Sequence, residues 1–354
     1  MGERVGRRRG AGRLRRALLA TLVTAAVVVP VSAAAHPVVP APAPARLGPV
    51  TAGTLEAAYA ANRATAARAA AMAAAHGADG RARALRAMAS RGRTFLSLDP
   101  RGPGRAAEVV GDLAHAGRIA VLVPGSDTSL DTFGRFRAGA TALRGRLGAR
   151  AAVVAWLGYP TPGTVSTAVL TPGRARRAAP ELAALVRRLH AIAPRRAAVS
   201  LLCHSYGSVV CAAAAPRLRG AAAVTDLVLV GSPGTGADRA ADLGTGATVW
   251  AARGAGDRIA DVPHVRAGFL GTTIGFGPDP VSAAFGARVF AAGDGGHSDY
   301  FRPGTRSLAN LTRIVLGRYA EVTGGTGGTG GTGGTGGTGG AGRARDASRE
   351  AGHG

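Results

Sequence analysis

The sequence has 354 residues, enough for one sizeable folded core with non-core segments at its ends. Its formal net charge is +24, all 44 basic residues are arginine, and aromatic residues make up only 4% of the chain. A scattered arginine excess with few aromatic rings disfavours a specific nucleic-acid-binding protein, because base stacking needs those rings. It is compatible with weak electrostatic attraction to an anionic cell envelope.

The N-terminus has the pattern of an export signal. Residues 1–16 are rich in arginine, residues 17–35 (ALLATLVTAAVVVPVSAAA) are apolar, and Ala33-Ala34-Ala35 fits a cleavage site for a signal peptidase. Arg15-Arg16 also fits a twin-arginine signal, and an uncleaved membrane anchor is the alternative to cleavage. We therefore expect a signal peptide at residues 1–35 and a secreted or envelope-associated protein.

Two segments of simple composition follow the signal. Residues 36–50 are rich in proline and predict an extended spacer. Residues 51–93 are rich in alanine and predict helices over 54–75 and 81–90. The main domain is therefore expected to begin at residue 94.

Residues 94–322 alternate short apolar runs with helical or glycine-rich segments. The apolar runs are RIAVLV (118–123), AAVVAW (151–156), AAVSLLC (197–203), VTDLVLV (224–230), ATVWAA (247–252) and ARVFAA (287–292). Continuous apolar runs of this length suit strands that are buried on both faces. The fold class is therefore α/β, with a mostly parallel sheet and helices on both of its faces.

The C-terminal segment, residues 323–354, begins with a Thr-Gly-Gly repeat and ends in polar residues. It contains too few apolar side chains to build a core, so we expect a disordered tail.

One strand-to-helix junction carries reactive side chains. The stretch Cys203-His204-Ser205-Tyr206-Gly207 interrupts a buried strand and precedes a helix of small residues. It matches the Gly-x-Ser-x-Gly nucleophile elbow except that cysteine replaces the first glycine. Ser205 is therefore the candidate nucleophile, and a serine on an ordinary turn is the alternative.

A serine nucleophile needs a histidine to take its proton and a carboxylate to orient that histidine. In this fold the chain order is serine, acid, histidine. Asp257 follows the expected strand at 247–252, and His297 lies on a glycine-rich loop after the last expected strand. We therefore assign Asp257 as the acid and His297 as the base.

Other residues compete for these two roles. Asp261 and Asp279 are alternative acids, and His264 is an alternative base or a substrate-binding residue. His204 is expected to be structural because it points away on a tight turn. Asp294 and Asp299 are close to His297 in the sequence and are expected at most to orient its loop.

The negative charge that develops on a substrate carbonyl needs two backbone donors. We expect the amides of Tyr206 and Ser126, the second from the loop after the first parallel strand. The segment 157–180 is expected to border the substrate pocket, and the pocket residues themselves stay unknown. No metal-ligand spacing and no phosphate-binding loop is found in the sequence, so no metal or other cofactor is expected.

Cys203 and Cys211 are the only cysteines and lie on either side of Ser205. In an exported protein they are candidates for a disulfide. Two small buried thiols are the alternative.

Several stretches carry a family resemblance across residues 50–320. They include VVAWLGYPTP (153–162), LLCHSYGSVVC (201–211), LVLVGSPG (227–234), FGPDP (276–280) and GHSDYF (296–301). The sequence resembles a family of exported bacterial α/β-hydrolases from high-GC Gram-positive bacteria, mostly of unassigned substrate. This resemblance implies an α/β-hydrolase fold with Ser205 and His297 in the motif positions.

These observations lead to one functional hypothesis and two alternatives. We expect an exported serine hydrolase that cleaves a small-molecule or lipid carboxylic ester through an acyl-enzyme. A peptidase or amidase would use the same residues. The alternative of another class is an inactive hydrolase-fold protein that holds anionic polymer in the cell envelope. The oligomeric state cannot be inferred from the sequence.

Overall fold

The computed structural model describes residues 39–262, 264–269 and 272–325. The expected signal peptide and most of the expected tail lie outside these ranges. Among the helices in these ranges, none combines the length and the apolar character that crossing a bilayer would require.

The centre of the fold is an eight-stranded sheet in the order β1-β2-β4-β3-β5-β6-β7-β10. Its strands are β1 (Thr94–Asp99), β2 (Arg105–Val110), β3 (Arg118–Val123), β4 (Ala151–Leu157), β5 (Ala198–His204), β6 (Asp226–Val230), β7 (Thr248–Ala252) and β10 (Arg288–Val289). From β4 to β10 in this order each strand is parallel to the next, whereas β2 is antiparallel to both β1 and β4. This is the α/β-hydrolase architecture that the sequence predicted, with a mixed, mostly parallel sheet.

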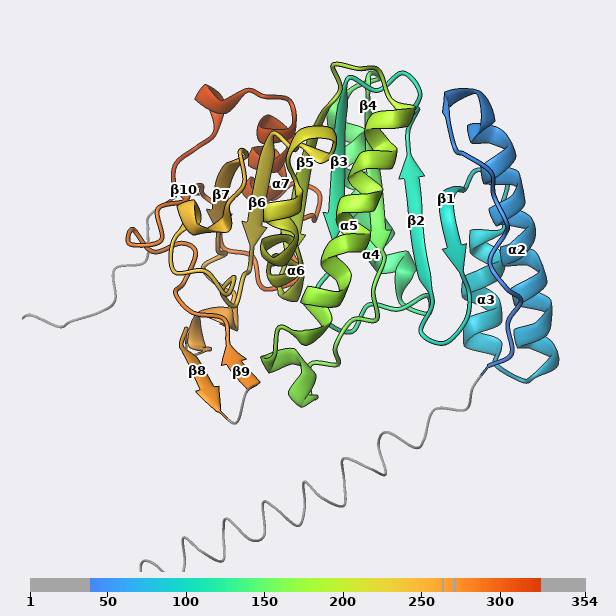
Figure 1. Cartoon of the computed structure of the whole chain (residues 1–354), viewed down its shortest axis with the longest axis horizontal. Coiled ribbons are helices and arrows are strands. Elements are labelled where there is room, and N and C mark those ends of the chain that lie inside the picture. The colour runs from blue at the N-terminus through green and yellow to red at the C-terminus, as the bar shows by residue number, and fades with distance from the viewer. Residues whose placement is uncertain (1–38, 263, 270–271, 326–354) are drawn as a thin grey trace, which may run out of the picture.

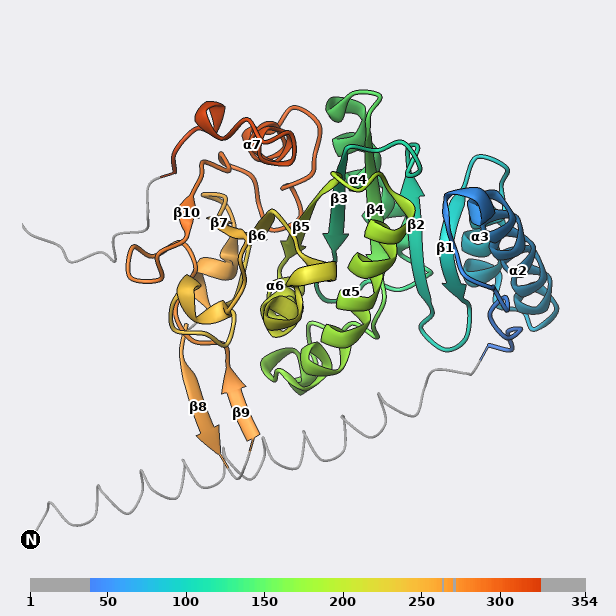
Figure 2. The same ribbon diagram turned by 45° about the horizontal axis from the view of Figure 1, so that its top comes forward.

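Helices cover both faces of this sheet (Figures 1 and 2). The main helices are α2 (Leu55–Ala75), α3 (Asp79–Met88), α4 (Phe133–Leu147), α5 (Gly173–Ile192), α6 (Tyr206–Ala214) and α7 (Arg306–Val315). Helices α5 and α6 pack their apolar side chains on one face, and α4 and α7 pack on the other. The central strands are buried from both sides, which explains their unalternated apolar sequences.

The N-terminal helices α2 and α3 lie beside the edge strand β1, at the end of the sheet opposite β10 (Figure 1). They begin and end close to the helices expected over 54–75 and 81–90. Placing them against β1 covers a sheet edge that would otherwise expose unpaired backbone groups.

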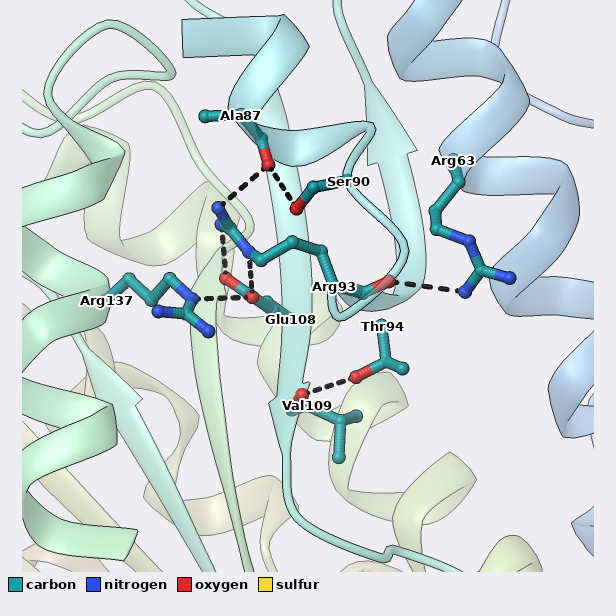
Figure 3. Close-up of polar contacts among 8 residues, drawn as sticks. All are labelled: Arg63, Ala87, Ser90, Arg93, Thr94, Glu108, Val109 and Arg137. Carbon is teal, nitrogen blue, oxygen red and sulfur yellow. Dashed lines mark hydrogen bonds and ion pairs between the residues drawn. The ribbon is translucent and has the colours of Figure 1, made fainter. Parts of the chain in front are cut away.

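A buried carboxylate ties this helical segment to the sheet (Figure 3). Glu108 on β2 is only 1% exposed and accepts hydrogen bonds from the guanidinium groups of Arg93 and Arg137. Arg93 also donates to Ala87 O at the end of α3, and its own carbonyl accepts from Arg63 of α2. A buried charge must be paired, and here the pairing connects α2, α3, β2 and α4.

Besides the strands β1 and β2, two parts of the structure were not expected from the sequence. The first is a small antiparallel hairpin of β8 (Arg266–Phe269) and β9 (Thr272–Gly275), inserted between β7 and β10. The second corrects the boundary of the tail. Residues 323–325 pair with the region of β10, since Ala291 N donates to Thr323 O (3.0 Å) and Gly325 N donates to Val289 O (3.2 Å). Backbone pairing with an edge strand needs no apolar side chain, so composition did not indicate it.

Candidate active site

Ser205 lies between the end of β5 and the start of α6 in a conformation that side chains rarely adopt. Its φ is 54° and its ψ is −128°. Its backbone N–H donates to Val230 O of β6 (3.0 Å), which holds the turn against the neighbouring strand. A Cβ at Gly207 would lie 2.5 Å from Val123 O, so only glycine allows this close approach of α6 to β3. The turn therefore has the strain and the tight packing of a nucleophile elbow.

Cys203 and Cys211 form a disulfide, and both are fully buried. The bond links the end of β5 to the second turn of α6, with their Cα atoms 6.4 Å apart. Cys203 thus fills the first small position of the elbow while it holds the strand and the helix together on either side of Ser205.

Asp257 and His297 come together from two different loops. His297 Nδ1 lies 2.9 Å from Asp257 Oδ1 and 3.0 Å from Oδ2. Asp257 follows β7 and is 2% exposed, whereas the His297 side chain is 37% exposed. Because a carboxylate only accepts hydrogen bonds, Nδ1 carries the proton in this contact. In a neutral His297 ring, Nε2 is then free to accept a proton.

Asp257 has further donors that keep it ionised. Tyr300 Oη donates to Asp257 Oδ2 (2.5 Å), and Ile259 N donates to Oδ1 (2.9 Å). Burial raises the pKa of Asp257, but the hydrogen bonds from His297, Tyr300 and Ile259 outweigh burial, so the pKa lies below its ordinary value. Tyr300 Oη itself accepts from Gly254 N (3.0 Å), which fixes the phenol on the loop that carries Asp257.

His204 holds the loop of His297 in place. Its Nε2 donates to the backbone O of His297 (2.7 Å), and the two ring centroids are 4.7 Å apart. Burial, and after it the nearby His297, lowers the pKa of His204 to about 4. His204 is therefore neutral at neutral pH and serves as a fixed donor, in line with its expected structural role.

Ser205 and His297 lie on either side of the residues that end β6. Ser205 bonds to Val230, and the next residue, Gly231, packs so closely on the site that a Cβ there would lie 2.9 Å from Asp257 Oδ2 and 3.2 Å from His297 Cε1. Among the hydrogen bonds of the described residues, none joins Ser205 Oγ to His297. Catalytic hydrogen bonds are often long before substrate binds, so this geometry is compatible with proton transfer between them.

The two expected oxyanion donors lie beside Ser205. Strand β3 pairs with β5 so that Val123 is opposite Cys203, and the loop after β3 therefore reaches the elbow. A Cβ at Gly125 would be 2.6 Å from Ser205 Cβ, which places Ser126 next to the nucleophile. Tyr206 N is the first amide of α6, a position that has no acceptor within its own helix.

The loop of Ser126 is braced by the loop after β4. Asp127, with φ 56°, donates its N–H to Pro162 O (3.0 Å), and its carboxylate accepts from Thr164 N (3.2 Å). The segment 157–180, expected to border the pocket, therefore directly contacts the loop that carries Ser126, which we call the oxyanion loop.

The competing residues have other partners. Asp279 pairs with Arg253 and lies 3.9 Å from His264 Nε2. Asp261 and Asp294 are exposed on the surface. Asp299 accepts a hydrogen bond from Gly296 N (2.8 Å), so it orients the His297 loop. This is the role that the sequence analysis allowed for it. Of the acids considered, only Asp257 forms a hydrogen bond with His297 in the described part of the chain.

Sequence reasoning missed Tyr300 and Gly231. Tyr300 lies three residues after His297 and Gly231 directly follows β6, but neither contact is local in the sequence. Only the packing of the three loops brings them to Asp257.

Residues 99–267 match a protein family described as alpha/beta hydrolase. Over these residues the chain is similar to that family, and its fold is the α/β-hydrolase fold. Similar solved structures include an α/β serine hydrolase from Xanthomonas campestris, with 18% identity, coverage of 66% of this chain and 98% of that chain, and a TM-score of 0.40. Another is a carboxylesterase from Mesorhizobium loti, with 15% identity, coverage of 60% and 95%, and a TM-score of 0.38.

Curated proteins similar to this chain include two from mycobacteria. An uncharacterised protein of Mycobacterium tuberculosis is 31% identical over 252 residues, which cover 61% of this chain and 37% of the relative. An uncharacterised protein of Mycobacterium bovis is 35% identical over 182 residues, which cover 46% of this chain and 66% of the relative. The chain thus spans just over a third of the first relative, and neither relative has a described substrate.

Proposed function

We propose that this α/β-hydrolase is an exported serine hydrolase that cleaves carboxylic esters through an acyl-enzyme. Ser205 is the nucleophile, His297 the general base and Asp257 the acid that orients it. The observation that carries the proposal is the Asp257–His297 contact beside a strained Ser205, on loops that follow the parallel strands β7, β10 and β5. Ligand and catalytic sites in open α/β sheets lie at this edge of the sheet.

In the acylation step, Ser205 Oγ attacks the ester carbonyl carbon while its proton passes to His297 Nε2. The carbonyl oxygen becomes negative and accepts hydrogen bonds from the amides of Ser126 and Tyr206. The ionised Asp257 stabilises the imidazolium that forms. When the tetrahedral intermediate collapses, the alcohol oxygen leaves with the proton from Nε2, and the acyl group stays on Ser205.

In the deacylation step, water takes the place of the alcohol. His297 Nε2 removes a proton from the water as its oxygen attacks the acyl carbon, and Ser205 then leaves with that proton. The products are a carboxylic acid and the free enzyme. Amide, thioester or lactone bonds would follow the same course. Carboxylic esters are proposed because they are the commonest substrates of this triad chemistry, and no residue of the site selects them over the other bonds.

Labelling with a fluorophosphonate tests the nucleophile. We expect stoichiometric modification of Ser205 in the wild type, located by peptide mapping, and none in Ser205→Ala. His297→Ala should label at least a thousandfold more slowly, because serine alone is a weak nucleophile. Ser298→Ala is the matched control, since Ser298 is an exposed serine next to His297 and should label like the wild type.

A folded wild type that never labels would contradict this proposal. If it then bound anionic polymer equally well with and without Ser205, the binding-protein alternative would take its place. Ester and peptide anilide substrates compared on the labelled enzyme separate an esterase from a peptidase. Export is tested separately, by N-terminal sequencing of protein recovered outside the cytoplasm.

A further inference from the structure

Large apolar side chains that are exposed to solvent are concentrated in two segments of the surface. Six such side chains occur in the described residues, and five of them form what we call the apolar rim. The apolar rim consists of Val165, Leu170, Val262, Val265 and Ile274. The sixth, Met72, lies on α2 at the far end of the molecule (Figure 1). Single exposed apolar residues are ordinary, but a concentration of this kind marks an interaction surface.

The first segment of the rim is attached to the oxyanion loop. Val165 is fully exposed and directly follows Thr164, whose backbone N–H and hydroxyl both donate to the carboxylate of Asp127. Leu170 ends the short 3₁₀ helix Thr167–Leu170. This segment therefore projects from the edge of the sheet where Ser126 and Ser205 lie.

The second segment of the rim, which we call its hairpin side, contains Val262, Val265 and Ile274. The end of β9 on this side lies beside Tyr206. Phe276 directly follows β9 and packs edge-on against the Tyr206 ring, with the centroids 5.8 Å apart. Val265 O accepts from Gly277 N, which holds the other arm of the hairpin. Both views show β8 and β9 projecting on the same side of the molecule as the loop that precedes α5 (Figures 1 and 2).

The charge next to the rim is positive. Residues 157–180 contain Arg174, Arg176 and Arg177 and no acidic residue. Arg176 and Arg177 are exposed, whereas Arg174 donates to the carbonyls of Pro160 and Thr161 at the base of the loop. On the hairpin side Arg266 pairs with Asp238, and the exposed Asp261 directly precedes Val262, so the excess positive charge lies only at the start of α5.

We propose that the apolar rim docks on an anionic lipid surface, with Val165 and Ile274 entering the interface and Arg176 and Arg177 facing lipid phosphates. Apolar side chains gain free energy when they enter the boundary between headgroups and acyl chains, and arginines add attraction to an anionic leaflet. This arrangement would turn the strand ends that carry Ser205 and the oxyanion loop toward the membrane. Docking itself does not depend on turnover, whereas lipid esters as substrates would rest on the proposed function.

Sedimentation with lipid vesicles tests the docking in the full-length protein carrying Ser205→Ala, which keeps the rim and removes turnover. We expect binding to phosphatidylglycerol vesicles that weakens as salt is added, and at least tenfold weaker binding to phosphatidylcholine vesicles. Because labelling of Ser205 is measured separately on the wild type, a failure to bind vesicles and a failure of the proposed catalysis can be told apart.

Matched variants identify the surface that binds. Val165→Glu combined with Ile274→Glu should weaken binding to phosphatidylglycerol about tenfold or more. Met72→Glu introduces one such charge, as each of the two rim substitutions does, at an apolar residue as exposed as Val262 (38% each) but far from the rim, and should bind within about twofold of the parent. Arg176→Gln and Arg177→Gln should each weaken binding about fivefold.

Three outcomes would overturn the proposal. One is vesicle binding that the rim variant leaves unchanged, and a second is equal loss in the Met72→Glu control. The third is a dimer that dissociates in Val165→Ser, since that result would make a second copy the occupant of the rim. Val165→Ser also serves as a variant that should fold normally, because this fully exposed side chain makes no core contact. It should weaken vesicle binding measurably.

Discussion

Two buried aspartates, Asp226 and Asp257, lie at opposite ends of the parallel strands and differ in the partners they hold. Asp226 begins β6 and is completely buried. Its carboxylate accepts from Ser200, Thr225, Trp250 and Tyr319, all of them neutral donors. Asp257 is also buried, but one of its donors is the imidazole of His297, which is 37% exposed.

The difference shows what separates a structural buried carboxylate from a functional one. Around Asp226 the donors are three hydroxyl groups and an indole, which do not take up a proton near neutral pH, so the cluster offers no base to a molecule outside. Around Asp257, Tyr300 and Ile259 fix the carboxylate, and it orients a titratable ring that reaches solvent. A saturated network stabilises the fold, whereas a network with one exposed titratable member can do chemistry.

Exchanging each aspartate for asparagine gives the largest expected contrast. Asp257→Asn should lower kcat for an ester substrate about ten-thousandfold, because an amide in place of the carboxylate favours the wrong tautomer of His297. Asp226→Asn should leave kcat within about twofold and instead lower the free energy of unfolding by about 1–3 kcal/mol, since its amide N–H₂ cannot accept from the donors that face it.

Ester turnover and urea unfolding of both variants measure this contrast. A fall in kcat for Asp226→Asn as large as that for Asp257→Asn would mean that both changes act through folding. The division into a structural and a functional aspartate would then be wrong.

The sequence predicted the site as far as local patterns extend. The apolar runs around Ser205 and the position of His297 after the last strand were sufficient to predict the fold and to nominate both residues. The sequence also placed Asp257 after β7, but it left Asp261 and Asp279 open, because the loop from residue 253 to 287 has no periodic pattern. Asp279, one of the two alternative acids, pairs with Arg253, and this contact forms only because the loop folds back on itself.

The clusters that surround Asp226 and Glu108 were not predicted either. Trp250 and Tyr319 reach Asp226 from β7 and from beyond α7, and Arg137 reaches Glu108 from α4. Such partners are far apart in the chain, and a single sequence contains no signal that connects them. Strand β2 was missed because Glu108 and the exposed Arg105 break its apolar run, and β1 was missed because Ser97 and Asp99 interrupt its run.

His204 extends the comparison, because it is a buried titratable group of the site that pairs with no carboxylate. Burial lowers its pKa from 6.5 to about 4, so the unfolded chain binds its proton more readily than the folded protein does. Stability from neutral His204 is therefore complete above about pH 6.5 and is lost as pH falls toward about 4. Between about pH 7 and about pH 5 this loss amounts to about 2 kcal/mol.

Replacing His204 with glutamine should remove that acid sensitivity. The glutamine amide can donate to His297 O as the imidazole does, but it does not titrate. Urea unfolding at the two pH values should show a loss about 2 kcal/mol smaller in His204→Gln than in the wild type. His190→Gln is the control, since His190 also contacts a backbone carbonyl but is placed away from the site. Equal pH dependence in wild type and His204→Gln would show that His204 is not buried as a neutral group.

The two tyrosines that contact the aspartates allow the finest test of the comparison. Tyr300 donates to Asp257, and Tyr319 donates to Asp226 (3.2 Å). Burial raises the pKa of both phenols, to about 12 for Tyr319, so both carry their protons at neutral pH. Removing either hydroxyl deletes one hydrogen bond to a buried carboxylate and little else.

Tyr300→Phe should lower kcat about tenfold with KM nearly unchanged, because a hydrogen bond to a charged group contributes about 1.5–3 kcal/mol and Asp257 without it orients His297 less well. Tyr319→Phe should lower stability by a similar amount and leave kcat unchanged. Steady-state kinetics and urea unfolding of the pair decide the outcome. If Tyr300→Phe lost stability but kept its kcat, then Tyr300 would only support the loop, and the two aspartates would differ by His297 alone.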